Sequence, residues 1–93
     1  MVIKYSDKFI DEIEVIVNFI SLDSKDRASE FAMNLKKKID DIFPMPYRFR
    51  KNQKLNDEKV RDLIYKGYVV PFFIYDDHIE ILGIFKENLH KLA

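Results

Sequence analysis

The segment 60–85 (VRDLIYKGYVVPFFIYDDHIEILGIF) constrains the fold most, because it contains three strand-length apolar runs with only two residues between neighbouring runs. The runs are residues 60–65, 68–75 and 78–85. They are rich in β-branched and aromatic residues, which favour the pleated surface of a sheet. The linkers Lys66-Gly67 and Asp76-Asp77 have the composition of tight hairpin turns. The segment therefore predicts a three-stranded antiparallel meander.

Pro71 lies inside the second of these runs. Proline has no backbone N–H and cannot donate a hydrogen bond to a neighbouring strand. We therefore expect either a bulge in this strand or an orientation that turns Pro71 away from its partner.

The first twenty residues predict a strand followed by a helix. Val2–Tyr5 is short and partly β-branched, so we expect it to add a strand to the sheet. Ser6 is a suitable N-cap, and apolar residues recur at helical spacing over residues 7–20.

A second helix follows a short polar link. Asp23 or Ser24 is suited to cap it, and it must end before Pro44. Because so short a link forces two helices to run antiparallel, the pair forms a helical hairpin. The sequence therefore predicts one α+β domain over residues 1–93, with an N-terminal strand, a helical hairpin and a meander, and with both helices on one face of the sheet.

Composition limits the functional classes. The chain has no Cys, which excludes disulfides and thiolate metal sites, and we expect no metal and no cofactor. No apolar run approaches the roughly 20 residues of a membrane span, so we expect a cytoplasmic protein. The 16 basic and 16 acidic residues balance, unlike the composition of a general nucleic-acid binder.

Positive charge is concentrated in the middle of the chain. Residues 44–66 hold seven Lys or Arg against three Asp or Glu. Within them, Tyr47 and Phe49 alternate with basic residues that we list as candidate phosphate or target contacts. These are Arg48, Arg50, Lys51 and Lys54. The alternative interpretation is a surface loop whose charges only keep the protein in solution.

The order of these elements, together with several short motifs, resembles the RelE/ParE superfamily of bacterial toxins. The motifs are VRDL (60–63), GYVV (67–70), DD (76–77) and IEILGIF (79–85). The resemblance spans nearly the whole chain. It implies the toxin of a type II toxin–antitoxin module, of the kind that stabilises plasmids, which inhibits growth and is bound by a cognate antitoxin.

The superfamily has two activities. RelE-like members cleave messenger RNA at the ribosome, whereas ParE-like members inhibit DNA gyrase without a known reaction of their own. The residue after Tyr68 is Val69, where RelE-like toxins typically carry a second arginine, and no tyrosine follows the last strand. The resemblance therefore favours gyrase as the target over the ribosome. A third possibility is a degenerate toxin that only binds its antitoxin.

The resemblance also adds candidate site residues. If the chain is a metal-independent ribonuclease, Arg61, Glu87 and His90 are the candidate catalytic residues. In either case Arg61, Tyr68 and Lys86 join the candidate contacts to nucleic acid or target. Arg61 is the first residue to mutate, and from the sequence we expect Arg61→Ala to keep the fold and weaken toxicity.

Overall fold

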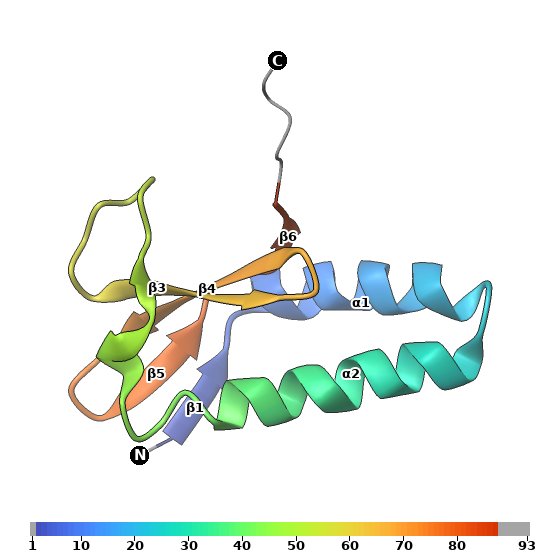
Figure 1. Ribbon diagram of the computed structural model, residues 1–93, viewed down its shortest axis with the longest axis horizontal. Coiled ribbons are helices and arrows are strands. Elements are labelled where there is room, and N and C mark those ends of the chain that lie inside the picture. The colour runs from blue at the N-terminus through green and yellow to red at the C-terminus, as the bar shows by residue number, and fades with distance from the viewer. Residues whose placement is uncertain (1, 88–93) are drawn as a thin grey trace.

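Six strands form one mixed sheet in the computed structural model, which describes residues 2–87 of the chain (Figure 1). They are β1 (Val2–Tyr5), β2 (Arg50–Lys51), β3 (Val60–Tyr65), β4 (Tyr68–Ile74), β5 (His78–Ile81) and β6 (Phe85–Lys86). Their order is β1-β5-β4-β3-β2, and β6 pairs with β4 beyond the end of β5. β1 is parallel to β5, and the other pairs in the described chain are antiparallel. The predicted N-terminal strand and meander are both present.

A two-residue turn joins β3 to β4 and fixes their register. Lys66 and Gly67 both have positive φ, at 50° and 83°. This is the backbone of the tight turn whose twist matches that of the flanking strands. It places Tyr65 opposite Tyr68.

Pro71 is accommodated by a break in the neighbouring strand. It stays in register with Asp62 of β3, so β4 itself has no bulge there. Its carbonyl accepts a hydrogen bond from Leu82 N at 2.8 Å, and in a strand the nitrogen of a residue faces the same side as its carbonyl. The nitrogen therefore faces the gap between β5 and β6, where the third predicted run is interrupted.

This gap packs against the first helix. Ile84 N donates to Glu12 Oε1 at 2.9 Å, and a Cβ added to Gly83 would lie 2.7 Å from the same oxygen. A side chain at position 83 would therefore displace Glu12.

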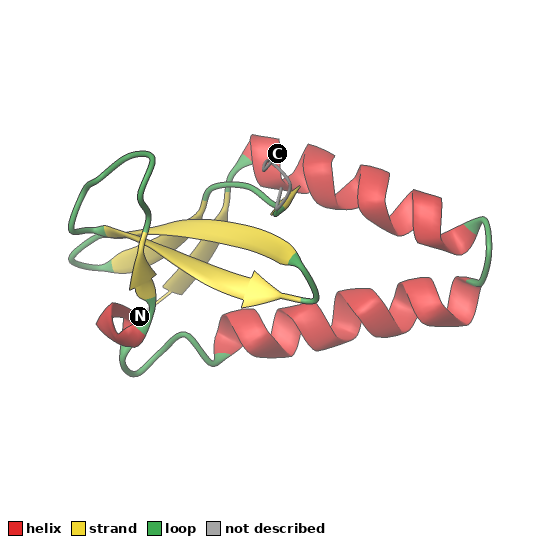
Figure 2. Cartoon of the chain, turned by 45° about the horizontal axis from the view of Figure 1, so that its top comes forward, coloured by secondary structure: helices red, strands yellow, loops and turns green. Residues whose placement is uncertain are grey.

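The two helices, α1 (Asp7–Ser21) and α2 (Lys25–Asp40), form the predicted hairpin. Ser6 Oγ accepts from Phe9 N at 3.0 Å, and Ser24 Oγ accepts from Arg27 N at 3.1 Å, so both serines are N-caps. Figures 1 and 2 show the helices antiparallel, with their connecting turn extending past the β3–β4 turn. Neither helix is long and apolar enough to span a membrane, as far as residues 2–87 show.

Both helices pack on the same face of the sheet, as predicted. Phe9 of α1 and Phe31 of α2 belong to one buried cluster with Leu63, Tyr65 and Phe72. The hydroxyl of Tyr65 donates to Phe31 O at 3.0 Å, and burial raises the pKa of this hydroxyl. The fold class, α+β, is therefore the predicted one.

Candidate functional site

Consecutive residues of β3 point to opposite faces of the sheet. Leu63 and Tyr65 lie in the core beneath the helices, so Arg61 is on that same face by the period of two. Asp62 and Ile64 are on the other face, which carries no helix and which we call the open face. The neighbours Arg61 and Asp62 therefore belong to different sites.

A cleft of about 480 Å³ lies on the open face, and we call it the β2–β6 cleft. It lies between the loop that follows β2 and the segment at β6, which rise on the same side of the sheet in Figure 1. Its lining residues are Arg50, Asn52, Gln53, Lys54, Asp62, Val69, Phe85, Lys86 and Glu87. Lys86 is opposite Tyr68 in the register of β6 with β4, so its side chain is on the helix-covered face. The charges that face the cleft are therefore two cations and two carboxylates, which balance.

Asp62 is the buried centre of this cleft, with a side chain only 4% exposed. Asn52 Nδ2 donates to its Oδ1 at 2.8 Å, and Arg50 Nε lies 3.3 Å from its Oδ2. Asn52 is itself held, because its Oδ1 accepts from Leu55 N at 2.8 Å. Each oxygen of the buried carboxylate thus has a donor, as a buried charge requires.

Arg50 lies between two carboxylates. One is Asp62, and the other is Glu87, whose Oε2 is 3.6 Å from Arg50 Nη2. Glu87 is anchored by its backbone N–H, which donates to Gly67 O at 2.9 Å. The side chain of Arg50 is nevertheless 52% exposed, so its outer edge faces the cleft.

The two lysines of the cleft lie against aromatic rings. Lys54 Nζ is 5.8 Å from the ring centre of Phe85, and Lys86 Nζ is 4.9 Å from that of Tyr68. The ring of Tyr68 packs edge-on against Phe31 on the helix-covered face, so the ammonium group of Lys86 lies on that face and not in the cleft.

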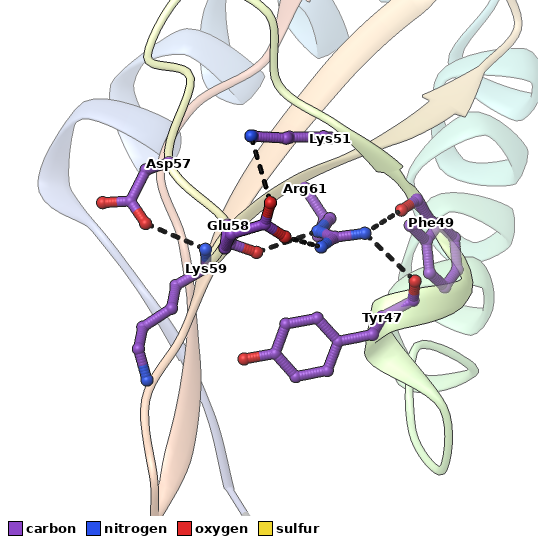
Figure 3. Close-up of polar contacts among 7 residues, drawn as sticks. All are labelled: Tyr47, Phe49, Lys51, Asp57, Glu58, Lys59 and Arg61. Atoms are coloured by element: carbon purple, nitrogen blue, oxygen red, sulfur yellow. Dashed lines mark hydrogen bonds and ion pairs between the residues drawn. The ribbon is translucent and has the colours of Figure 1, made fainter.

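Arg61 lies outside the cleft and binds the segment that precedes β2 (Figure 3). Its Nη1 donates to the carbonyls of Tyr47 and Phe49, both at 3.1 Å. Its Nε donates to Glu58 O and its Nη2 to Glu58 Oε1, both at 3.0 Å. The side chain is only 14% exposed, so the guanidinium is largely occupied by the protein itself.

Two further candidate residues, Lys51 and Arg48, lie outside the cleft. Lys51 Nζ pairs with Glu58 at 3.2 Å, and Arg48 donates to Asp41 O at 2.8 Å, so neither lines the cleft. His90 lies outside the described residues. The structure therefore brings together four of the candidates that the sequence indicated. These are Arg50, Lys54, Lys86 and Glu87.

The two residues at the buried centre of the site were not among the sequence candidates. Among the charged and amide side chains in the described part of the chain, only Asp62 and Asn52 are buried. The available signal was a charged residue in the middle of a run that otherwise predicts a strand, because such a residue needs a partner if it is buried.

The cleft can contact an anion through the outer edge of Arg50, which is exposed. Lys54 supplies a second positive charge, and no cluster of three or more potential metal ligands exists within residues 2–87. Val69 forms part of the wall and is 3% exposed. The position after Tyr68 thus holds a buried apolar side chain behind the wall of the cleft, with almost no exposed surface.

Comparison with known proteins agrees with this fold. The family model for the ParE toxin of the type II toxin–antitoxin system, parDE, matches residues 3–88. The solved structure of a chromosomal ParDE toxin–antitoxin system from P. aeruginosa superposes with a TM-score of 0.74 and 17% identity, covering 92% of this chain and 95% of that chain. No curated protein matches the sequence. Because the family model covers most of its length, the chain belongs to the ParE toxin family of type II toxin–antitoxin systems.

Proposed function

We propose that this chain inhibits bacterial growth from the cytoplasm by binding DNA gyrase, and that it does not cleave RNA. The observation that carries this proposal is the state of Arg50, the only arginine that lines the β2–β6 cleft. Its charge is shared between Asp62 and Glu87. A ribonuclease needs net positive charge at the phosphate that it cleaves, and in this cleft the two carboxylates balance the charges of Arg50 and Lys54.

Val69 supports the same proposal. RelE-like ribonucleases typically carry an arginine at this position, whereas here an apolar side chain lines the cleft. Arg61 does not compensate, because its guanidinium is bound to Glu58 and to loop carbonyls on the other face of the sheet. Inhibition by binding requires no reacting group and is compatible with this arrangement.

Cleavage of messenger RNA at the ribosome is the second candidate function. The observation in its favour is Glu87, a carboxylate beside Arg50 in the cleft. A carboxylate next to a cation can take a proton from a ribose hydroxyl while the cation holds the phosphate.

The two functions are separated with purified components. We would measure supercoiling by DNA gyrase and the integrity of messenger RNA in a translating extract, each at a series of toxin concentrations. We expect loss of supercoiling with intact RNA. Codon-phased RNA cleavage with normal supercoiling would contradict the proposal and support the second function.

Inducible expression tests the toxic effect itself. The family implies an antitoxin partner, so growth is to be followed with and without the cognate antitoxin. We expect arrest on induction of the toxin alone. Normal growth with soluble, folded toxin would contradict toxicity and indicate a degenerate toxin that only binds its antitoxin.

A further inference from the structure

We propose that residues 82–87 form a strap that opens and closes as a unit at the wall of the β2–β6 cleft. Glu12 of α1 is the latch that holds the strap closed, and Gly83 is the position that admits this latch. The inference does not depend on the target of the toxin. It follows from the break between β5 and β6, from the contacts of one carboxylate and from the exposure of β6.

The sheet holds the first half of the strap only weakly. Leu82 N donates to Pro71 O at 2.8 Å, but Pro71 has no N–H to return a hydrogen bond. Residues 82–84 have no register partner in β4. The strap therefore rejoins β4 only at Phe85 and Lys86, in a strand of two residues.

Glu12 supplies the contact that the sheet does not. Its Oε1 accepts from Ile84 N at 2.9 Å, and its Oε2 lies 2.6 Å from Lys8 Nζ. Both oxygens are thus held, although the side chain is 30% exposed. Ile84 is only 2% exposed, so its N–H loses its acceptor if the carboxylate moves away.

Gly83 makes this contact possible. A Cβ at this position would lie 2.7 Å from Glu12 Oε1, closer than carbon and oxygen atoms approach without a bond. In the described chain Gly67 is the glycine with positive φ, so the backbone at position 83 does not itself require glycine. The missing side chain at position 83 therefore serves the approach of Glu12.

The outer half of the strap separates two hollows. Phe85 and Lys86 line the β2–β6 cleft and also a hollow of about 400 Å³ beside Val15 and Ile16 of α1. Phe85 is 39% exposed, and it lies opposite Val69, which is 3% exposed. A short, exposed strand opens more readily than the core of a sheet. Opening of the strap would uncover Val69 and join the two hollows, so the latch sets the shape of the cleft.

The direct test is amide hydrogen exchange of the full chain, measured residue by residue by NMR. In Glu12→Ala we expect the amides of Ile84 and Glu87 to exchange roughly tenfold faster than in the parent chain. Glu12→Gln keeps an acceptor oxygen and should exchange at close to the parent rate. Glu14→Ala is the matched control, because Glu14 is an exposed carboxylate on the same helix, and it should change neither amide.

Gly83→Ala tests the latch without removing its charge. The added Cβ displaces the Glu12 carboxylate, so we expect the same increase in exchange at Ile84 and Glu87, again roughly tenfold. Combining Gly83→Ala with Glu12→Ala should add little to either single substitution, because both remove the same contact.

A covalent lock tests the movement itself. Glu87 N donates to Gly67 O, so the alternation of an antiparallel pair makes Tyr68 and Lys86 the neighbouring pair without hydrogen bonds, whose side chains are close. The chain has no native Cys, so Tyr68→Cys with Lys86→Cys can form a single disulfide. In the Glu12→Ala background we expect oxidation to restore slow exchange at Glu87, and reduction of the same protein to reverse this.

Each alternative outcome overturns the proposal. Parent-like exchange in Glu12→Ala and Gly83→Ala would show that Glu12 does not hold the strap. Equally faster exchange at Leu63 and Val70, in the centres of β3 and β4, would indicate a general loss of stability in place of a separate opening unit. Exchange at Glu87 that ignores oxidation would exclude the movement. A circular dichroism melt identifies any variant that unfolds, and Gly83→Ala keeps the test decisive if Glu12→Ala does so.

Discussion

Arg61 and Arg50 lie on adjacent strands, yet they use the guanidinium group in opposite ways. Arg61 is on the helix-covered face, is 14% exposed and donates four hydrogen bonds to Tyr47, Phe49 and Glu58. Arg50 is next to Asp62 on the open face, is 52% exposed and donates one hydrogen bond. The first arginine is held by the protein itself, whereas the second leaves part of its guanidinium group exposed.

The difference arises from the period of a strand. Asp62 follows Arg61 directly, so the two side chains point to opposite faces of the sheet. Asp62 pairs with Arg50 on the open face. The position of an arginine in a motif therefore does not decide whether it contacts a ligand. The number of its N–H groups that the protein already uses is the better guide.

The largest effect is expected at the buried centre of the open face. Asp62→Ala leaves Asn52 and Arg50 without their acceptor, and we expect a loss of about 3 kcal/mol in the free energy of unfolding. Urea denaturation followed by circular dichroism measures this loss. Asp76→Ala is the control, because Asp76 is exposed in a turn, and it should change stability by less than about 0.5 kcal/mol. Equal effects of the two substitutions would contradict a buried network.

Arg61→Ala tests the opposite face and is expected to have the next largest effect. It removes the hydrogen bonds that tie Tyr47, Phe49 and Glu58 to β3, and we expect a loss of about 2 kcal/mol in the free energy of unfolding. Any loss of toxicity should then follow the folded fraction and recover at lower temperature. A variant as stable as the parent chain but without toxicity would instead support a direct role, such as the catalytic one that the resemblance implies.

Tyr65 provides a polar contact inside the core, and its loss is expected to have a smaller effect. Tyr65→Phe removes the hydrogen bond to Phe31 O, and we expect a loss of about 1 kcal/mol at neutral pH. Burial raises the pKa of Tyr65 above its usual 10.0, so the unfolded chain loses this proton first. The contribution of Tyr65 to stability is therefore fully present below pH 10 and is lost as the pH rises through its pKa in the folded state. Urea titrations from pH 8 to 11 should show a steeper decline for the parent chain than for Tyr65→Phe, and parallel declines would exclude this contribution.

Most of the fold could be predicted from local chemistry. The serine caps, the turn at Lys66-Gly67 and the spacing of apolar residues determine the elements with little help from tertiary contacts. The interruption after Ile81 could not be predicted, because it depends on Pro71 in one strand and Glu12 in the helix acting on a third segment. Such a break is a tertiary effect.

The candidate site could be predicted only in part. The sequence identified Arg50, Lys54 and Glu87 as candidate site residues. It did not indicate that all three line one cleft. The pairing of Arg50 with Asp62 depends on the register of β2 with β3, and β2 is a two-residue strand in a segment without a periodic pattern. Asp62 was missed for the same reason, because its partners come from that segment.

The smallest effect is expected at the β4–β5 turn. Asp77 Oδ1 lies 2.7 Å from His78 Nδ1, and this hydrogen bond holds the pKa of the Asp77 carboxyl below its usual 3.8. The pair therefore stabilises the fold above pH 4, and this contribution is lost as the pH falls through the lowered pKa. Because Asp77 is exposed, Asp77→Asn should lower the melting temperature only slightly at pH 6, less than any substitution above. The difference from the parent chain should then shrink below pH 3, whereas Asp76→Asn, one residue away, should show no such convergence. Melting curves of the three proteins between pH 2 and 7 that remain parallel would exclude a contribution from this pair.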